Sequence, residues 1–67
     1  MTGINKAVAA SGGARELASK LGVTRQAVAK WQVRGWVPLN RALQIEVLYG
    51  IPRQELLKPD IAALLAA

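Results

Sequence analysis

The side chains best suited to chemistry in this chain of 67 residues lie between residues 25 and 30. Arg25 carries a guanidinium fork that matches the O6 and N7 acceptors of guanine, and Gln26 carries an amide that matches N6 and N7 of adenine. Ala29 and Lys30 follow one helical turn later, where a methyl group can contact thymine and an ammonium group can reach a base edge or a phosphate. We therefore interpret these four residues as a set that contacts DNA bases. Phosphate contact is the alternative role for Arg25, Gln26 and Lys30.

A second set of polar residues surrounds these four and is suited to the phosphate backbone of DNA. Its members are Arg15, Thr24, Arg34 and Arg41. Arg15 is expected in the first turn of a helix, where free backbone N–H groups also favour phosphate, and its alternative is a surface pair with a carboxylate. Thr24 is better suited to capping a helix and touching a phosphate than to reading a base. For Arg34 and Arg41, the sequence is as compatible with a phosphate role as with none.

Two helices joined by a tight turn, within residues 14–33, are needed to hold these side chains on one face. Ala18 is small where the two helices cross, and Gly22, four positions on, can adopt the positive φ of the turn. Val28 and Trp31 then point inward from the second helix, at the spacing of a helix-turn-helix. A plain structural helical hairpin is the alternative, and the basic outer face of the second helix argues against it.

The charge of the chain is concentrated on the same segment. Nine Lys and Arg residues oppose four Asp and Glu residues, which gives a net charge of +5. Six of the nine basic residues, and a single acid, Glu16, lie between Arg15 and Arg41. Solubility alone can explain a net charge, but this local concentration predicts attraction of a polyanion such as double-stranded DNA.

Composition argues against catalysis and metal binding. The chain has no cysteine and no histidine, which excludes disulfides, thiolate metal sites and histidine acid–base chemistry. The four carboxylates form no convincing acid–base pair. Glu46 can pair with Arg41 or with a basic group of a partner, or simply be solvated. We therefore expect no enzyme, no metal, no cofactor and no small-molecule substrate.

The remaining pattern predicts a single all-α domain over residues 1–67, with four to five helices. Thr2 is suited to capping a first helix that ends near Ser11, and Pro38 and Gly50 are suited to bounding a later one. The expected elements are helices over about 3–11, 14–20, 24–33 and 38–49, a short segment over 53–57 and a short helical tail over 61–67.

The C-terminal half carries more apolar residues than a 67-residue monomer can bury. The helix ending at Tyr49 is apolar on more than one side, and the apolar segment 52–67 follows it. We therefore predict a weak symmetric homodimer, since two copies would also read more base pairs than one. Its predicted interface consists of Leu48, Leu56, Leu57 and Ile61. Trp36 can pack under its own loop or lie at this interface.

Several motifs together resemble a known group of proteins. They are Gly12-Gly13, Leu-Ala-Ser-Lys-Leu-Gly-Val (17–23), Gln-Ala-Val-Ala-Lys-Trp (26–31), Val37-Pro38, Ile45-Glu46 and Leu-Lys-Pro-Asp-Ile (57–61). The chain resembles the all-helical branch of the Cro proteins of temperate bacteriophages and the related YdaS-like helix-turn-helix proteins of prophages. This resemblance implies a lambda-repressor-like DNA-binding domain and a small dimeric repressor that binds a pseudo-palindromic operator. Ala29 departs from the polar residue often found at its position in these proteins.

Location and an alternative function complete these expectations. The longest apolar run, 61–67, is too short to span a bilayer, and no signal sequence is evident, so we expect a protein of the bacterial cytoplasm, encoded by a phage or prophage. The alternative function is an antitoxin-like or other protein-interaction module. It would use the apolar side chains of Ile61, Leu64 and Leu65.

Overall fold

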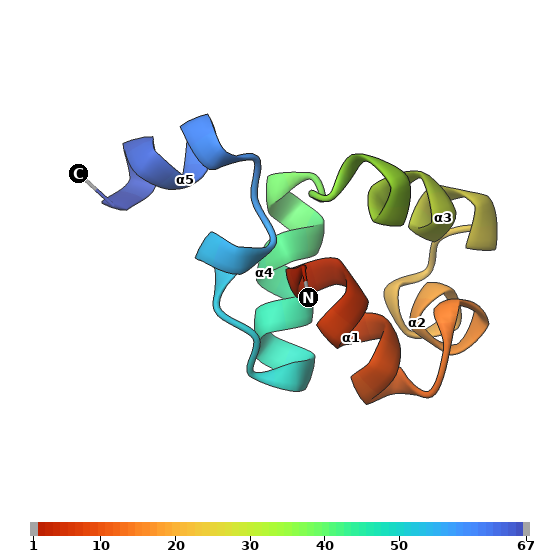
Figure 1. The fold of residues 1–67 in the computed structure, drawn as a ribbon. Coiled ribbons are helices and arrows are strands. Elements are labelled where there is room, and N and C mark those ends of the chain that lie inside the picture. Colours follow the sequence, from red (N-terminus) through yellow and green to blue (C-terminus); the bar gives the residue numbers. More distant parts are fainter. Residues whose placement is uncertain (1, 67) are drawn as a thin grey trace.

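Five α-helices and one 3₁₀-helix make up residues 2–66, the part of the chain that this computed structural model describes (Figure 1). They are α1 (Gly3–Ser11), α2 (Ala14–Leu21), α3 (Arg25–Arg34), α4 (Leu39–Tyr49), the 3₁₀-helix η1 (Arg53–Glu55) and α5 (Pro59–Ala66). No strand occurs within this range, so the predicted all-α fold is confirmed. Met1 and Ala67, at the ends of the predicted domain and tail, lie outside the described residues.

Local capping signals fix the helix boundaries. The hydroxyl of Thr2 accepts a hydrogen bond from the backbone N–H of Asn5, and that of Thr24 accepts one from Ala27 at 3.1 Å. Both residues are N-caps, as predicted. Gly22 ends α2 with a φ of 73°, a left-handed conformation that glycine adopts without steric cost. The positive φ of Gly22 therefore forms the turn between α2 and α3, as predicted.

A continuous apolar core lies between the helices. It consists of Ile4, Ala7, Leu17, Ala18, Leu21, Val28, Trp31, Val37, Ala42, Ile45, Ile51, Leu56 and Leu57. Gly3 is buried where α1 meets η1, and a Cβ atom there would lie 2.2 Å from the carbonyl oxygen of Glu55. An ion pair between Lys6 and Glu55 joins the same two elements. Close approach of α1 to η1 thus requires glycine at position 3, because glycine has no Cβ atom.

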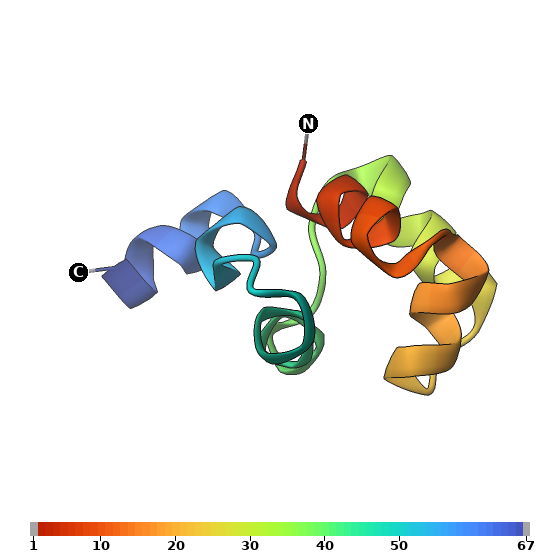
Figure 2. The same ribbon diagram turned by 90° about the horizontal axis from the view of Figure 1, so that it is seen from below.

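The helix-turn-helix pair and the C-terminal helix lie at opposite ends of the molecule. In Figure 1, α2 and α3 are on the right and α5 is at the upper left, with α1 and α4 between them, and Figure 2 shows the same separation from below. The longest dimension is 34 Å, against 21 Å in the other two directions. Helix α2 packs against α1 and α3, whereas α5 packs mainly against η1. None of the helices within residues 2–66 is both long enough and apolar enough to cross a membrane.

The predicted dimer interface is wrong for two of its four residues, Leu56 and Leu57. Leu56 and Leu57 are 0% and 5% exposed, because the turn at η1 folds them into the core of their own chain. Leu48 and Ile61 remain exposed and available. The surplus of apolar surface was correctly predicted. Leu64 and Leu65 of α5, expected to be available to a partner, are also exposed, and so is Val47 of α4, which was not named among the interface residues.

Glu46 pairs with Arg53 rather than with Arg41. Its two carboxylate oxygens accept hydrogen bonds from the backbone N–H of Arg53 at 2.9 Å and from the guanidinium at 2.7 and 3.0 Å. These bonds, that of the side chain first, lower the pKa of Glu46 below its ordinary value of 4.5. The turn after α4 brings Arg53 back alongside Glu46, so this pair fastens η1 to α4.

Candidate nucleic-acid interface

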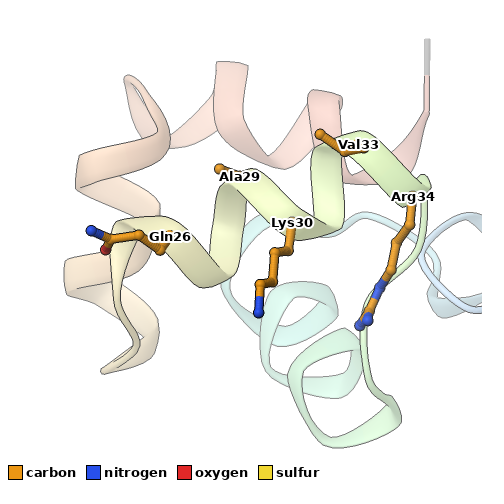
Figure 3. A pocket seen from close by; sticks show the side chains of 5 residues that line it. All are labelled: Gln26, Ala29, Lys30, Val33 and Arg34. Atoms are coloured by element: carbon orange, nitrogen blue, oxygen red, sulfur yellow. The ribbon is translucent and has the colours of Figure 1, made fainter.

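The outer face of α3 brings the four predicted base-contacting residues together. Arg25, Gln26, Ala29 and Lys30 are all exposed, on one helix of ten residues. Figure 3 shows Gln26 near the start of the helix, with Ala29 and Lys30 following along it. Residues 25–34 include three cations and no carboxylate. This face therefore presents hydrogen-bond donors and positive charge without an internal acid to neutralise them.

The inner face of α3 fixes the direction in which this outer face points. Val28 is fully buried and Trp31 is 5% exposed, so both side chains anchor the helix in the core. Gln32 adds a polar contact, because its side-chain amide donates a hydrogen bond to Asn5 of α1 at 3.1 Å. The helix is thereby held to α1 and α2 along its length, as a rigid reading element requires.

Arg41, predicted to contact the DNA backbone, makes contacts within the protein. Its Nη1 atom donates hydrogen bonds to the carbonyl oxygen of Leu21 and to the side chain of Gln44, each at 2.8 Å. Leu21 is the last residue of α2, where carbonyl groups lack helical partners and a positive charge is favourable. Arg41 therefore braces the helix-turn-helix turn against α4.

Arg34, the last residue of α3, lies against Trp36. Its guanidinium carbon is 3.8 Å from the centre of the indole ring, and its Nε atom donates a hydrogen bond to the carbonyl oxygen of Trp36 at 3.3 Å. The ammonium group of Lys58 is 5.7 Å from the same ring. Trp36 is half-buried, so it packs against its own loop and supports a pair of cations at this end of α3.

The other two predicted backbone-contacting residues occupy helix starts. Arg15 is exposed in the first turn of α2, whose N-cap, Gly13, makes no side-chain capping hydrogen bond. The first N–H groups of α2 are therefore not capped by a side chain, which favours an anion there. Thr24 is exposed at the start of α3, and its hydroxyl already accepts the capping bond from Ala27.

One exposed residue of α3 was missed by the sequence interpretation. Val33 is 90% exposed and follows Ala29 by four positions and Lys30 by three, so it continues the same face. The spacing 26, 29, 30, 33 was a signal that could have identified it. The sequence interpretation used it only to mark the end of the helix.

Comparison with known protein families finds a match. The family model described as bacterial toxin YdaS matches residues 4–64, which include the whole helix-turn-helix. No curated protein and no solved structure matches the chain.

Proposed function

We propose that this chain, which belongs to the family described as bacterial toxin YdaS, is a sequence-specific DNA-binding repressor of the phage Cro type. The observation that carries the proposal is the outer face of α3. This face combines Arg25, Gln26 and Lys30, contains no acid, and is held rigid by its buried side. Helices α1 and α3 both have a side-chain N-cap, but the first two turns of α1 carry one exposed cation, Lys6, which pairs with Glu55, whereas those of α3 carry Arg25 and Lys30.

The proposed mechanism places α3 in the major groove. Arg25, Gln26, Ala29 and Lys30 would contact base edges, while Arg15, Thr24 and Arg34 would contact phosphates. Arg41 is assigned a positioning role, because its guanidinium binds the end of α2. Repression would follow from occupying an operator and excluding polymerase or an activator.

The family's description as a toxin fits this mechanism without a catalytic step. A protein that occupies promoters becomes harmful when it blocks genes that the cell requires. Three of the four carboxylates lie beside cations within the protein: Glu46 with Arg53, Glu55 with Lys6, and Asp60 with Lys58. We therefore propose that any toxicity arises from binding rather than from an enzymatic reaction.

Selection from a random duplex pool tests the proposal. The selected duplex should then bind with an affinity that falls steeply with salt, with a log–log slope of about −0.9 per phosphate contacted. Arg25→Ala and Gln26→Ala should each cost about 1–3 kcal/mol on this duplex and much less on random DNA. Arg15→Ala is the matched control, because it should weaken binding to both duplexes alike. A slope near zero would exclude the proposed DNA binding.

We propose further that two copies bind the operator as a weak dimer. Two α3 helices in successive major grooves would lie about 34 Å apart. Apart from Val33 on α3 and Leu39 at the start of α4, the exposed large apolar residues form two separate groups. These are Val47 with Leu48 at the end of α4, and Ile61 with Leu64 and Leu65 on α5, and these parts lie apart in Figure 1. Sedimentation with a palindromic duplex, using Leu48→Ser and Leu64→Ser separately, would identify the group that pairs. A strict one-to-one complex at excess protein would exclude the dimer.

The exposed leucines of α5 favour a second candidate function. Leu64 and Leu65 lie on a helix that packs mainly against η1, so they are open to another protein. An antitoxin-like interaction module would use this surface. If such a module acts on the cell by binding a protein, Leu64→Ser should abolish any toxicity on overproduction while DNA affinity is unchanged. The repressor hypothesis predicts instead that Arg25→Ala abolishes any toxicity.

A further inference from the structure

We propose that Val33 determines specificity by receiving, together with Ala29, the C5 methyl group of a thymine. This inference rests on the proposed function, because it assumes that the outer face of α3 enters the major groove. It adds thymine as a recognised base and Val33 as a specificity-determining residue. Val33 was not among the DNA-contacting residues expected from the sequence.

The observation behind the inference is an exposed valine on an otherwise polar face. Val33 is 90% exposed, although a solvent-facing position at the end of a helix gives an apolar side chain nothing to bury. Together with Gln26, Ala29, Lys30 and Arg34 it lines a shallow hollow on the surface of α3. This hollow is wide enough for a methyl group and open enough for DNA to reach it.

The side chains around the hollow form two rows. Figure 3 shows Ala29 and Val33 in one row along α3, and Lys30 and Arg34 in the other. Each row joins residues one helical turn apart, a rise of about 6 Å, which is less than two base-pair steps. An apolar row beside a cationic row matches a DNA groove, where the base methyl and the phosphate backbone lie next to each other.

Chemistry then selects thymine. Among the four bases, only thymine presents a methyl group in the major groove, and small apolar side chains are its usual contacts. The two neighbouring cations argue against an apolar protein partner at this place, because that partner would have to desolvate Lys30 and Arg34. A thymine methyl requires no such cost, since Lys30 can stay at a polar base edge and Arg34 at a phosphate.

The experiment replaces thymine by deoxyuridine, which lacks only this methyl group. In the duplex selected from the random pool, each thymine is replaced in turn and the dissociation constant is measured. A buried methyl group corresponds to about a fourfold change in affinity. We expect about this loss at one or two positions for the unaltered protein. Val33→Ala should bind the thymine duplex more weakly, by up to about fourfold, and should distinguish thymine from uracil less strongly at those positions.

Val47→Ala is the matched control. Val47 is 84% exposed on α4, so both variants remove the same exposed side chain without disturbing the core. Both should unfold at the temperature of the unaltered protein. Val47 belongs to a candidate dimer group, and any loss of affinity through dimerisation affects thymine and uracil duplexes alike, so Val47→Ala should keep the full uracil effect. Sequence-specific binding in which Val33→Ala keeps that effect would overturn this inference alone. Absence of binding to any duplex would overturn the proposed function as well.

Discussion

Replacing Arg41 by alanine separates support of the helix-turn-helix from contact with DNA. In the structure, one guanidinium nitrogen donates to the carbonyl oxygen of Leu21 and to Gln44, both at 2.8 Å. A DNA-contacting arginine and a bracing arginine both weaken binding when they are removed. They differ in what else changes, because only the first neutralises a phosphate and only the second holds α2 against α4.

The expected loss of stability follows from these contacts. A hydrogen bond from a charged group contributes about 1.5–3 kcal/mol when it is buried. Here one nitrogen serves two acceptors and the residue is half-exposed, so we expect about 1–2 kcal/mol. In a domain of this size, each kcal/mol shifts the melting temperature by about 4–8 °C. Arg41→Ala should therefore melt about 5–15 °C below the unaltered protein.

Thermal unfolding and salt-dependent DNA binding are measured on the same preparations. Arg15→Ala is the control, because Arg15 is exposed, is assigned to a phosphate and makes no side-chain hydrogen bond or ion pair within residues 2–66. Its melting temperature should hardly change, and the magnitude of its salt slope should fall by about 0.9. Arg41→Ala should show the reverse pattern. An unchanged melting temperature together with a reduced slope would refute the bracing role and restore Arg41 as a DNA contact.

Three further predictions concern stability. Gly3→Ala should destabilise the fold by about 1–3 kcal/mol in denaturant unfolding, because its Cβ atom would lie 2.2 Å from the carbonyl oxygen of Glu55; an unchanged midpoint would contradict this. Thr24→Ala should cost about 0.5–2 kcal/mol by removing the cap of α3, and Thr24→Ser should restore most of it. The lowered pKa of Glu46 means that its pairing with Arg53 stabilises the fold fully above its unfolded pKa of 4.5 and less as the pH falls through its lower folded value. The difference in melting temperature from Glu46→Gln should therefore shrink between neutral pH and about pH 3, and a constant difference would be inconsistent with it.

Local signals in the sequence were sufficient for the helix-turn-helix. A threonine at a helix start, a glycine at its end and apolar residues at helical spacing act over a few residues, so Thr24, Gly22 and Trp31 could be placed without a structure. The exposure of Arg25, Gln26 and Lys30 followed from the same periodicity. Whether these residues contact DNA stays a prediction.

The C-terminal part was less predictable because its contacts join distant elements. Apolar character alone does not distinguish Leu56, which fills the core, from Leu48, which stays outside. The difference depends on η1, a single short turn that directs Leu56 toward the core. Likewise, the sequence left Glu46 to pair with Arg41, to pair with a basic group of a partner or to be solvated, whereas the turn after Gly50 brings Arg53 to it. Both contacts depend on the direction that the chain takes after a turn, which local periodicity does not specify.

The distance between α3 and α5 has a consequence for how such a protein can diverge. These helices lie at opposite ends of a molecule 34 Å long, with α1 and α4 between them. Substitutions at well-separated sites without shared contacts act almost independently on free energy. Changes in Gln26 or Val33 can therefore accumulate without disturbing Leu64 or Leu65. Natural selection can therefore alter the exposed face of α3 while the apolar surface of α5 is maintained, and the reverse.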